Sequence, residues 1–477
     1  MRSLLLICIL ISFTNLVPFT DRAGAAEVDE TAVLDQIRER ALSSDWAYQR
    51  LADLTDKVGP RLSGSPQAEA AIAQVAEAMR QAGFKVTLQP IRVPRWVRGT
   101  EQAVIIDYPQ RPVGLTQNLH LTTLGGSVAT PPQGITAPVL VVQSFTELTA
   151  RRAEAKGRIV VFNVPYDQEL ADSGLAGPAY GQAVAYRRDG ASAAARVGAV
   201  AALVRSVGGA DFRLPHTGQM QYAADAEKIP TAALTAEDAA LLGRLAAQGK
   251  VSVKLTLTPQ TLPEVDSHNV IADWPGSERP DEIVLVSGHL DSWDLGTGAI
   301  DDGAGVAAAM GAAYVIKELK LRPKRTIRVV AWMNEENGGR GSRGYLTANQ
   351  DRIAQHAAVI ESDVGAGKPL GFSAYITAAS VTRLRSVVAA LGPIGATVID
   401  RSEEPVSTDI GPLQSAGVPG FEPLLDTRHY FDYHHTAADT LDKVDPLNLR
   451  HIVASLAVLA YQLADAPERL ERLPAAR

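Results

Sequence analysis

The chain has 477 residues, which is more than one hydrophobic core usually organises, so two or three domains are expected. Hydrophobic residues make up 46% and charged residues 21%, as in ordinary globular proteins, which excludes disordered and fibrous classes. The 46 basic and 53 acidic residues give a net charge of −7, whereas a nucleic-acid partner would need a basic surface.

The first 25 residues have the pattern of a signal peptide. Arg2 supplies a positive charge, residues 4–13 are apolar, and Ala23-Gly24-Ala25 offers small residues for cleavage. The apolar run is short for a membrane span, and a retained anchor is the alternative. We therefore predict a secreted or periplasmic protein that has no membrane attachment once the signal is removed. The single cysteine, Cys8, lies in this segment, so a metal would be held by histidine and carboxylate side chains.

Residues 26–112 are expected to begin the main domain. Their hydrophobic periodicity predicts helices over 35–42, 45–57 and 66–83, and a strand over 86–93.

Residues 113–265 have a different pattern, with frequent proline and glycine between short apolar segments. They predict strands over 139–143, 159–163 and 200–205, and one alanine-rich helix over 190–197. No cluster of metal-ligand residues occurs in this stretch. We expect an inserted, self-contained domain.

Residues 266–477 are expected to complete the main domain with regular strand–helix alternation. The strands are predicted over 283–287, 326–333 and 357–360, and the helices over 303–319, 381–391 and 447–463. Such alternation is typical of an α/β fold with a mainly parallel sheet and helices on both faces.

Histidine and carboxylate residues follow three successive predicted strands. His289 and Asp291 follow the first, Glu335 and Glu336 the second, and Asp363 the third. Because ligands bind at the carboxyl ends of the strands in open α/β sheets, we expect these side chains to share one site.

Two loops add further donors to the same set. Asp301 and Asp302 stand just before a predicted helix, and His434 and His435 stand before the last one. Each pair alone has an ordinary explanation, since acidic residues often cap helix N-termini. Together with the strand ends, they offer five oxygen and nitrogen ligands with several carboxylates to spare.

This residue set suits hydrolysis at a pair of metal ions. Two zinc ions roughly 3.5–4 Å apart lower the pKa of a bridging water and polarise a carbonyl. One carboxylate must bridge the ions, and another, not ligating, acts as general base; the pair Glu335-Glu336 can supply one ligand and one base. The sequence contains neither H-E-x-x-H nor G-x-S-x-G, which leaves mononuclear zinc proteases of that type and serine hydrolases of that fold unsupported.

The motifs G-H-L-D-S, A-I-D-D-G-A-G, N-E-E-N-G-G, E-S-D and H-H-T-A-A-D-T occur in this order. They resemble the co-catalytic di-zinc exopeptidases that include bacterial leucyl aminopeptidases. The segments W-D-L-G-T-G, Y-R-R-D-G-A and P-H-T-G resemble the carboxypeptidase Q (plasma glutamate carboxypeptidase) subgroup. The resemblance covers nearly the whole mature chain and implies that residues 113–265 form a protease-associated-like domain.

The resemblance also implies a role for each candidate ligand. His289 and Asp363 would hold one zinc, Glu336 and His435 would hold the other, and Asp301 would bridge them. Two zinc ions per chain are therefore expected.

Further roles follow from the same resemblance. Glu335 becomes the general base, Asp291 orients His289, and the peptide bond between Asp301 and Asp302 is expected to be cis. His434 either stabilises an oxyanion or packs beside the site.

The implied activity is hydrolysis of dipeptides or short peptides, with a homodimer as a possible assembly. A broader aminopeptidase is the alternative enzyme. Some relatives of this fold are non-catalytic binding proteins or single-zinc cyclases, but all five ligand positions are filled here, which speaks against both.

Overall fold

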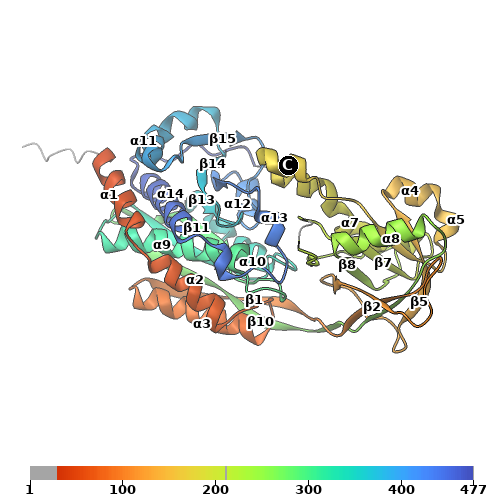
Figure 1. The fold of residues 1–477 in the computed structure, drawn as a ribbon. Coiled ribbons are helices and arrows are strands. Elements are labelled where there is room, and N and C mark those ends of the chain that lie inside the picture. Colours follow the sequence, from red (N-terminus) through yellow and green to blue (C-terminus); the bar gives the residue numbers. More distant parts are fainter. Residues whose placement is uncertain (1–29, 210–211, 476–477) are drawn as a thin grey trace, which may run out of the picture.

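The computed structural model describes residues 30–209 and 212–475, so the predicted signal peptide lies outside the described residues. Figure 1 shows two lobes, each built around its own sheet. The first sheet has eight strands in the order β1 (Lys85–Val97), β10 (Gln260–Trp274), β12 (Arg325–Trp332), β11 (Arg279–His289), β13 (His356–Glu361), β16 (Gly420–Leu425), β14 (Pro369–Tyr375) and β15 (Val398–Ser402).

The prediction of a mainly parallel sheet is right only for the centre, because the whole sheet is mixed. β12, β11, β13 and β16 run parallel to one another, and β14 runs parallel to β15. β10 is antiparallel to both β1 and β12, and β14 is antiparallel to β16. The chain leaves the first lobe along β1 and returns beside it along β10, so these two strands must run in opposite directions.

Alternate side chains of the central strands enter two different cores. In β11, Val284 and Val286 join the large core that includes α9 (Ala304–Glu318) and α14 (Pro446–Asp465). Ile283 and Leu285 face the opposite way and pack with residues of α10 (Arg340–Ala348) and α12 (Gly411–Ser415). The sheet is therefore covered by helices on both faces, as predicted.

The predicted helices before and around this sheet are largely confirmed. They are α1 (Glu30–Leu42), α2 (Trp46–Lys57), α3 (Pro66–Gln81), α9 and α14. The helix predicted over 381–391 is wrong in its first four residues. There Thr377 caps the 3-10 turn η4 (Ala378–Leu384) by accepting from the Ser380 backbone N–H, and only α11 (Arg385–Leu391) is α-helical.

Two helical stretches, residues 299–318 and 446–465, are long and apolar enough to cross a membrane. Their apolar windows are 94% and 67% buried inside the protein. Both therefore serve as core helices of the first lobe.

The second lobe is formed by the chain between β1 and β10. Its sheet has the order β3 (Gln117–Leu119), β2 (Glu101–Asp107), β9 (Ser252–Leu257), β5 (Ile135–Val142), β6 (Ile159–Phe162), β7 (Ala201–Arg205), β8 (Thr231–Leu234) and β4 (Leu121–Thr123). Its main helices are α4 (Phe145–Ala150), α5 (Arg152–Ala155), α7 (Ala176–Arg196) and α8 (Ala236–Ala246).

The three strands predicted in the second lobe are confirmed, and the helix predicted over 190–197 is the end of the longer α7. The lobe has hydrophobic cores of its own. Its assignment as a protease-associated-like domain over 113–265 stays a prediction.

His356, at the start of β13, should make the stability of the first lobe depend on pH. Burial, and then the nearby Arg328, lower the pKa of His356 from 6.5 to about 4, and its Nε2 accepts a 2.9 Å hydrogen bond from the Tyr345 hydroxyl. Between these pH values the unfolded chain binds a proton that the folded chain does not, so stability falls as the pH decreases through this window. From pH 7 to pH 5 we expect His356 to account for a loss of about 2 kcal/mol in the free energy of unfolding. Denaturant unfolding of the wild type and His356→Gln at pH 7, 6 and 5 measures this loss, and equal pH dependence in both proteins would contradict it.

Candidate metal centre

The predicted site residues meet at one edge of the first sheet. β11 ends at His289, Glu335 and Glu336 follow β12, and Asp363 follows β13. These three strands are parallel neighbours, so their carboxyl ends open at the same place. His435 arrives from the loop after α13 (Tyr430–Tyr433).

The carboxylate of Asp301 lies between two pairs of donors. Its Oδ1 is 3.2 Å from His289 Nε2, which is also 3.3 Å from Asp363 Oδ1. Its Oδ2 is 3.1 Å from His435 Nε2, which is also 3.1 Å from Glu336 Oε2. The structure thus brings all five predicted ligands together as two donor pairs joined by one carboxylate.

The donor set fits zinc, which binds imidazole nitrogen and carboxylate oxygen. Burial, together with the neighbouring Asp301 carboxylate, raises the pKa of Glu336 to about 8. Burial likewise raises the pKa of Asp363 well above its ordinary value. Carboxylates held this close and out of water disfavour one another's charged forms, and divalent cations would relieve that cost.

Glu335 and Glu336 point to different places, although they are neighbours in sequence. Glu336 contacts His435, and its Oε1 accepts a 3.2 Å hydrogen bond from the Trp293 backbone N–H. Glu335 is half-buried, and it lines the same cleft as His289 and Asp301. The arrangement suits one ligand and one free carboxylate beside the substrate.

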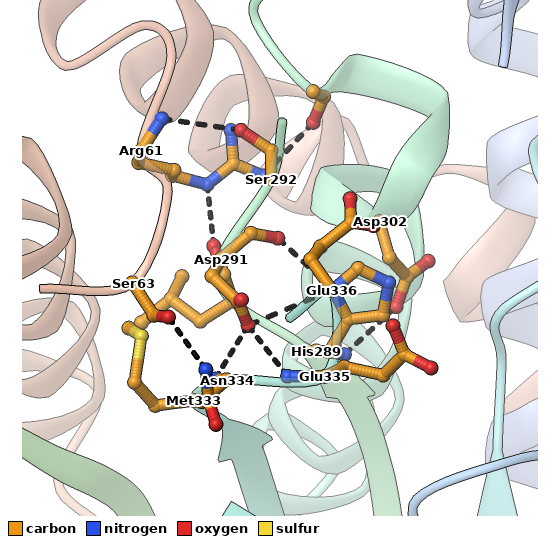
Figure 2. A network of polar contacts seen from close by, with 12 residues as sticks. Arg61, Ser63, His289, Asp291, Ser292, Asp302, Met333, Asn334, Glu335 and Glu336 are labelled. Carbon is orange, nitrogen blue, oxygen red and sulfur yellow. Dashed lines mark hydrogen bonds and ion pairs between the residues drawn. The ribbon is translucent and has the colours of Figure 1, made fainter. Parts of the chain in front are cut away.

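Asp291 holds the site through two different groups (Figure 2). Its backbone carbonyl accepts a 2.9 Å hydrogen bond from His289 Nδ1, while its carboxylate Oδ1 is 4.0 Å from that nitrogen. The same Oδ1 accepts hydrogen bonds from the backbone N–H groups of Asn334 (2.7 Å) and Glu335 (3.1 Å). Burial raises the pKa of Asp291 to about 6. Asp291 therefore orients His289 through the main chain, and its carboxylate fixes the turn that presents Glu335.

Comparison with known proteins agrees with this geometry. Residues 269–460 match the profile of peptidase family M28. The chain is 42% identical to human carboxypeptidase Q over 428 residues, which cover 89% of this chain and 87% of that protein. The chain belongs to peptidase family M28. The relation to carboxypeptidase Q that the motifs predicted is thereby confirmed, and the protein is a peptidase.

One solved structure supports the same assignment, and another shows the same fold. The M28 peptidase precursor from Shewanella amazonensis SB2B superimposes with a TM-score of 0.87 and 36% identity, covering 93% of this chain and 99% of that one. The zinc aminopeptidase BSAP from Bacillus subtilis shares the fold, with a TM-score of 0.63, 21% identity, and coverage of 90% and 98%. Both comparisons extend over the two lobes of this M28 peptidase.

Arg61 supports the metal centre, and sequence reasoning missed it. It is fully buried and donates hydrogen bonds from Nε to the Leu290 carbonyl (2.5 Å), from Nη1 to the Thr297 carbonyl (2.6 Å) and from Nη2 to the Gly298 carbonyl (2.9 Å). It ties the chain after β11 to the turn before Asp301 (Figure 2). No local motif marks this arginine, because its partners lie more than 200 residues away.

Two further carboxylates fix the turn that carries Asp301. Asp302 Oδ2 accepts from the His289 backbone N–H at 2.9 Å, and its Oδ1 accepts from the Gly305 N–H at 3.1 Å. Asp439 Oδ1 accepts from the backbone N–H groups of residues 299 and 300, at 2.8 and 2.7 Å. The peptide bond between Asp301 and Asp302 is cis, as the resemblance implied.

His434 lies directly beside two of the five predicted ligands, His435 and Asp301. Its ring stacks on that of His435, with centroids 3.5 Å apart, and its Nε2 is 3.4 Å from Asp301 Oδ2. His435 reaches both Asp301 and Glu336, and these contacts favour it as the ligand. A role for His434 in oxyanion stabilisation stays a prediction.

Proposed function

We propose that this M28 peptidase hydrolyses dipeptides or short peptides at a pair of zinc ions, and that it does so outside the cytoplasm after loss of residues 1–25. The observation that carries the proposal is the Asp301 carboxylate, which turns one oxygen to each of two donor pairs. His289 and Asp363 would hold one ion, and Glu336 and His435 the other. The similarity to carboxypeptidase Q and the zinc aminopeptidase fold support the metal and the exopeptidase class.

Side chains of the protein move the proton and hold the general base in position. When bound, the two zinc ions would lower the pKa of a water molecule and polarise the scissile carbonyl. Glu335 takes a proton from the attacking water, whose oxygen bonds to the carbonyl carbon, and returns it to the amine as the carbon–nitrogen bond breaks. Asp291 keeps Glu335 in place through the backbone of the 334–335 turn.

Metal removal tests the proposal. Dialysis against a chelator should abolish dipeptide hydrolysis, and zinc should restore it to a maximum at two equivalents per chain. Because the buried carboxylates repel one another without cations, the chelated protein should also melt at a lower temperature. Elemental analysis, turnover and thermal melts measure the three effects. Full activity with one zinc per chain would refute the two-ion mechanism, whereas an inactive protein that binds one zinc or none would favour the cyclase or binding-protein alternatives.

A broader aminopeptidase is the second candidate, and the fold shared with the Bacillus subtilis aminopeptidase favours it. The two candidates differ in how they treat long substrates. Successive release of N-terminal residues from a ten-residue peptide, at rates similar to dipeptide cleavage, would select the aminopeptidase.

A further inference from the structure

The second lobe contributes a cationic wall to the metal-centre cleft. Arg187 of α7 lines the same cleft as His289, Asp301 and Glu335. It is only 9% exposed, and its Nη1 lies 3.4 Å from the Thr217 carbonyl oxygen. The motifs Y-R-R-D-G-A and P-H-T-G, which contain Arg187 and residues 215–218, therefore meet at the site although both belong to the inserted segment.

The guanidinium of Arg187 is held in a fixed place. Its Cζ lies 5.4 Å from the ring centroid of Tyr180, and that ring stacks on Phe431 at 4.4 Å. On another side it rests against the backbone of Gly218, where an added Cβ would come within 2.4 Å of Nη1. A cation fixed by packing in this way loses little entropy when a ligand binds.

Arg187 lacks a counter-ion among the described residues. Its Nε has no hydrogen-bond partner there, and no carboxylate in residues 30–209 or 212–475 forms an ion pair with it. His435 Nδ1 is 3.4 Å from Nη1, but this nitrogen also lies 3.2 Å from the Thr217 carbonyl. Nε2 of His435 faces the carboxylates of Asp301 and Glu336, so its Nδ1 carries the hydrogen and donates to the Thr217 carbonyl. This nitrogen therefore cannot accept a hydrogen bond from Arg187.

The other two arginines of the cleft differ from Arg187, one by an ion pair and the other by its exposure. Arg188 pairs with Asp189 at 2.7 Å, and Arg343 is exposed and donates to the Gly338 carbonyl. A buried guanidinium without an anion is unfavourable, and its planar fork matches a carboxylate through two parallel hydrogen bonds.

We propose that Arg187 binds the free C-terminal carboxylate of the substrate, an inference that rests on the proposed peptidase function. Among the described residues the buried guanidinium of Arg187 has no anionic partner, so the wall formed by α7 favours a carboxylate of the substrate. A dipeptide places its terminal carboxylate one residue beyond the scissile bond. A peptide cleaved at an earlier bond brings a neutral amide to that place instead. The second lobe thereby favours cleavage at the C-terminal bond, which in a dipeptide is the bond between its two residues.

A matched pair of substrates tests the proposal: leucyl-alanine and leucyl-alanine amide. In the wild type, kcat/KM should be about 10- to 100-fold higher for the free acid, as expected for hydrogen bonds to a charged group, with most of the difference in KM. Arg187→Gln should bring the acid-to-amide ratio close to one. Arg187→Lys should give an intermediate ratio, because it keeps the charge and loses the fork. Arg196→Gln, on the same helix but exposed and paired with Asp225, should keep the wild-type ratio.

Binding gives a readout independent of turnover. Calorimetry with the uncleavable reduced-bond analogue of leucyl-alanine, as acid and as amide, should show the same preference in the wild type and its loss in Arg187→Gln. Equal binding and cleavage of acid and amide by the wild type would overturn the proposal. It would also be overturned if Arg187→Gln weakened both forms equally, because Arg187 would then only position Thr217 and His435. A zinc-loaded wild type that cleaves neither form would instead refute the proposed function.

Discussion

The Glu335→Gln variant should keep its fold and its zinc yet lose about 10²- to 10⁴-fold in kcat, the usual contribution of a general base. Glutamine has the same shape as glutamate but cannot take the proton of the attacking water. The Glu335 side chain is half-buried in the cleft, and its backbone N–H still donates to Asp291 after the substitution. Steady-state kinetics on a dipeptide and zinc analysis of the same sample measure the two quantities.

The matched control for this variant is Glu278→Gln, which makes the same chemical change at an exposed position before β11. It should leave kcat within about twofold, as surface substitutions usually have small effects. If Glu335→Gln lost zinc, Glu335 would be a ligand. If it kept wild-type kcat, another group would be the base.

The strand-end part of the site was predictable from local sequence. His289, Glu336 and Asp363 follow apolar strands directly, and parallel strands bring such positions to one edge whatever the loops do. The positions of Asp301 and His435 could not be derived in this way, because they lie in loops. Their paths depend on distant contacts such as those of Arg61, so the sequence offered both loop pairs as donors, but only the resemblance chose Asp301 and His435 within them.

The antiparallel pair β1 and β10 at the edge of the sheet was not predicted, for a different reason. The first half of β10, from Gln260 to Asp266, is exposed or half-exposed and carries Glu264 and Asp266, so it lacks the apolar run of a buried strand. Its pairing with β1 across the gap between lobes is a tertiary effect. Arg187 was missed as a site residue on similar grounds, because only the packing of the second lobe against the first brings α7 to the cleft.

Asp301→Asn should have the largest effect on the metals themselves. The substitution keeps the side chain's size but removes its negative charge and replaces one donor oxygen with an NH₂ group, which cannot bind a cation. Because each oxygen of Asp301 faces a different donor pair, the loss affects both ions. We expect zinc content to fall from two ions to one or fewer per chain. We also expect kcat/KM to fall by at least about 10³-fold, equivalent to about 4 kcal/mol of transition-state stabilisation.

Asp294→Asn provides the control on the same loop. Asp294 is partly exposed, and its carboxylate pairs with Arg98 at 2.6 Å instead of with a member of either donor pair, so this variant should retain both ions. Zinc titration of the two apo-variants, followed by calorimetry, separates a weakened site from a misfolded one, because a folded Asp301→Asn protein still offers His289 with Asp363 and His435 with Glu336. Two tightly bound ions and wild-type turnover in Asp301→Asn would mean that the carboxylate does not bridge, and the two donor pairs would then have to act as independent sites.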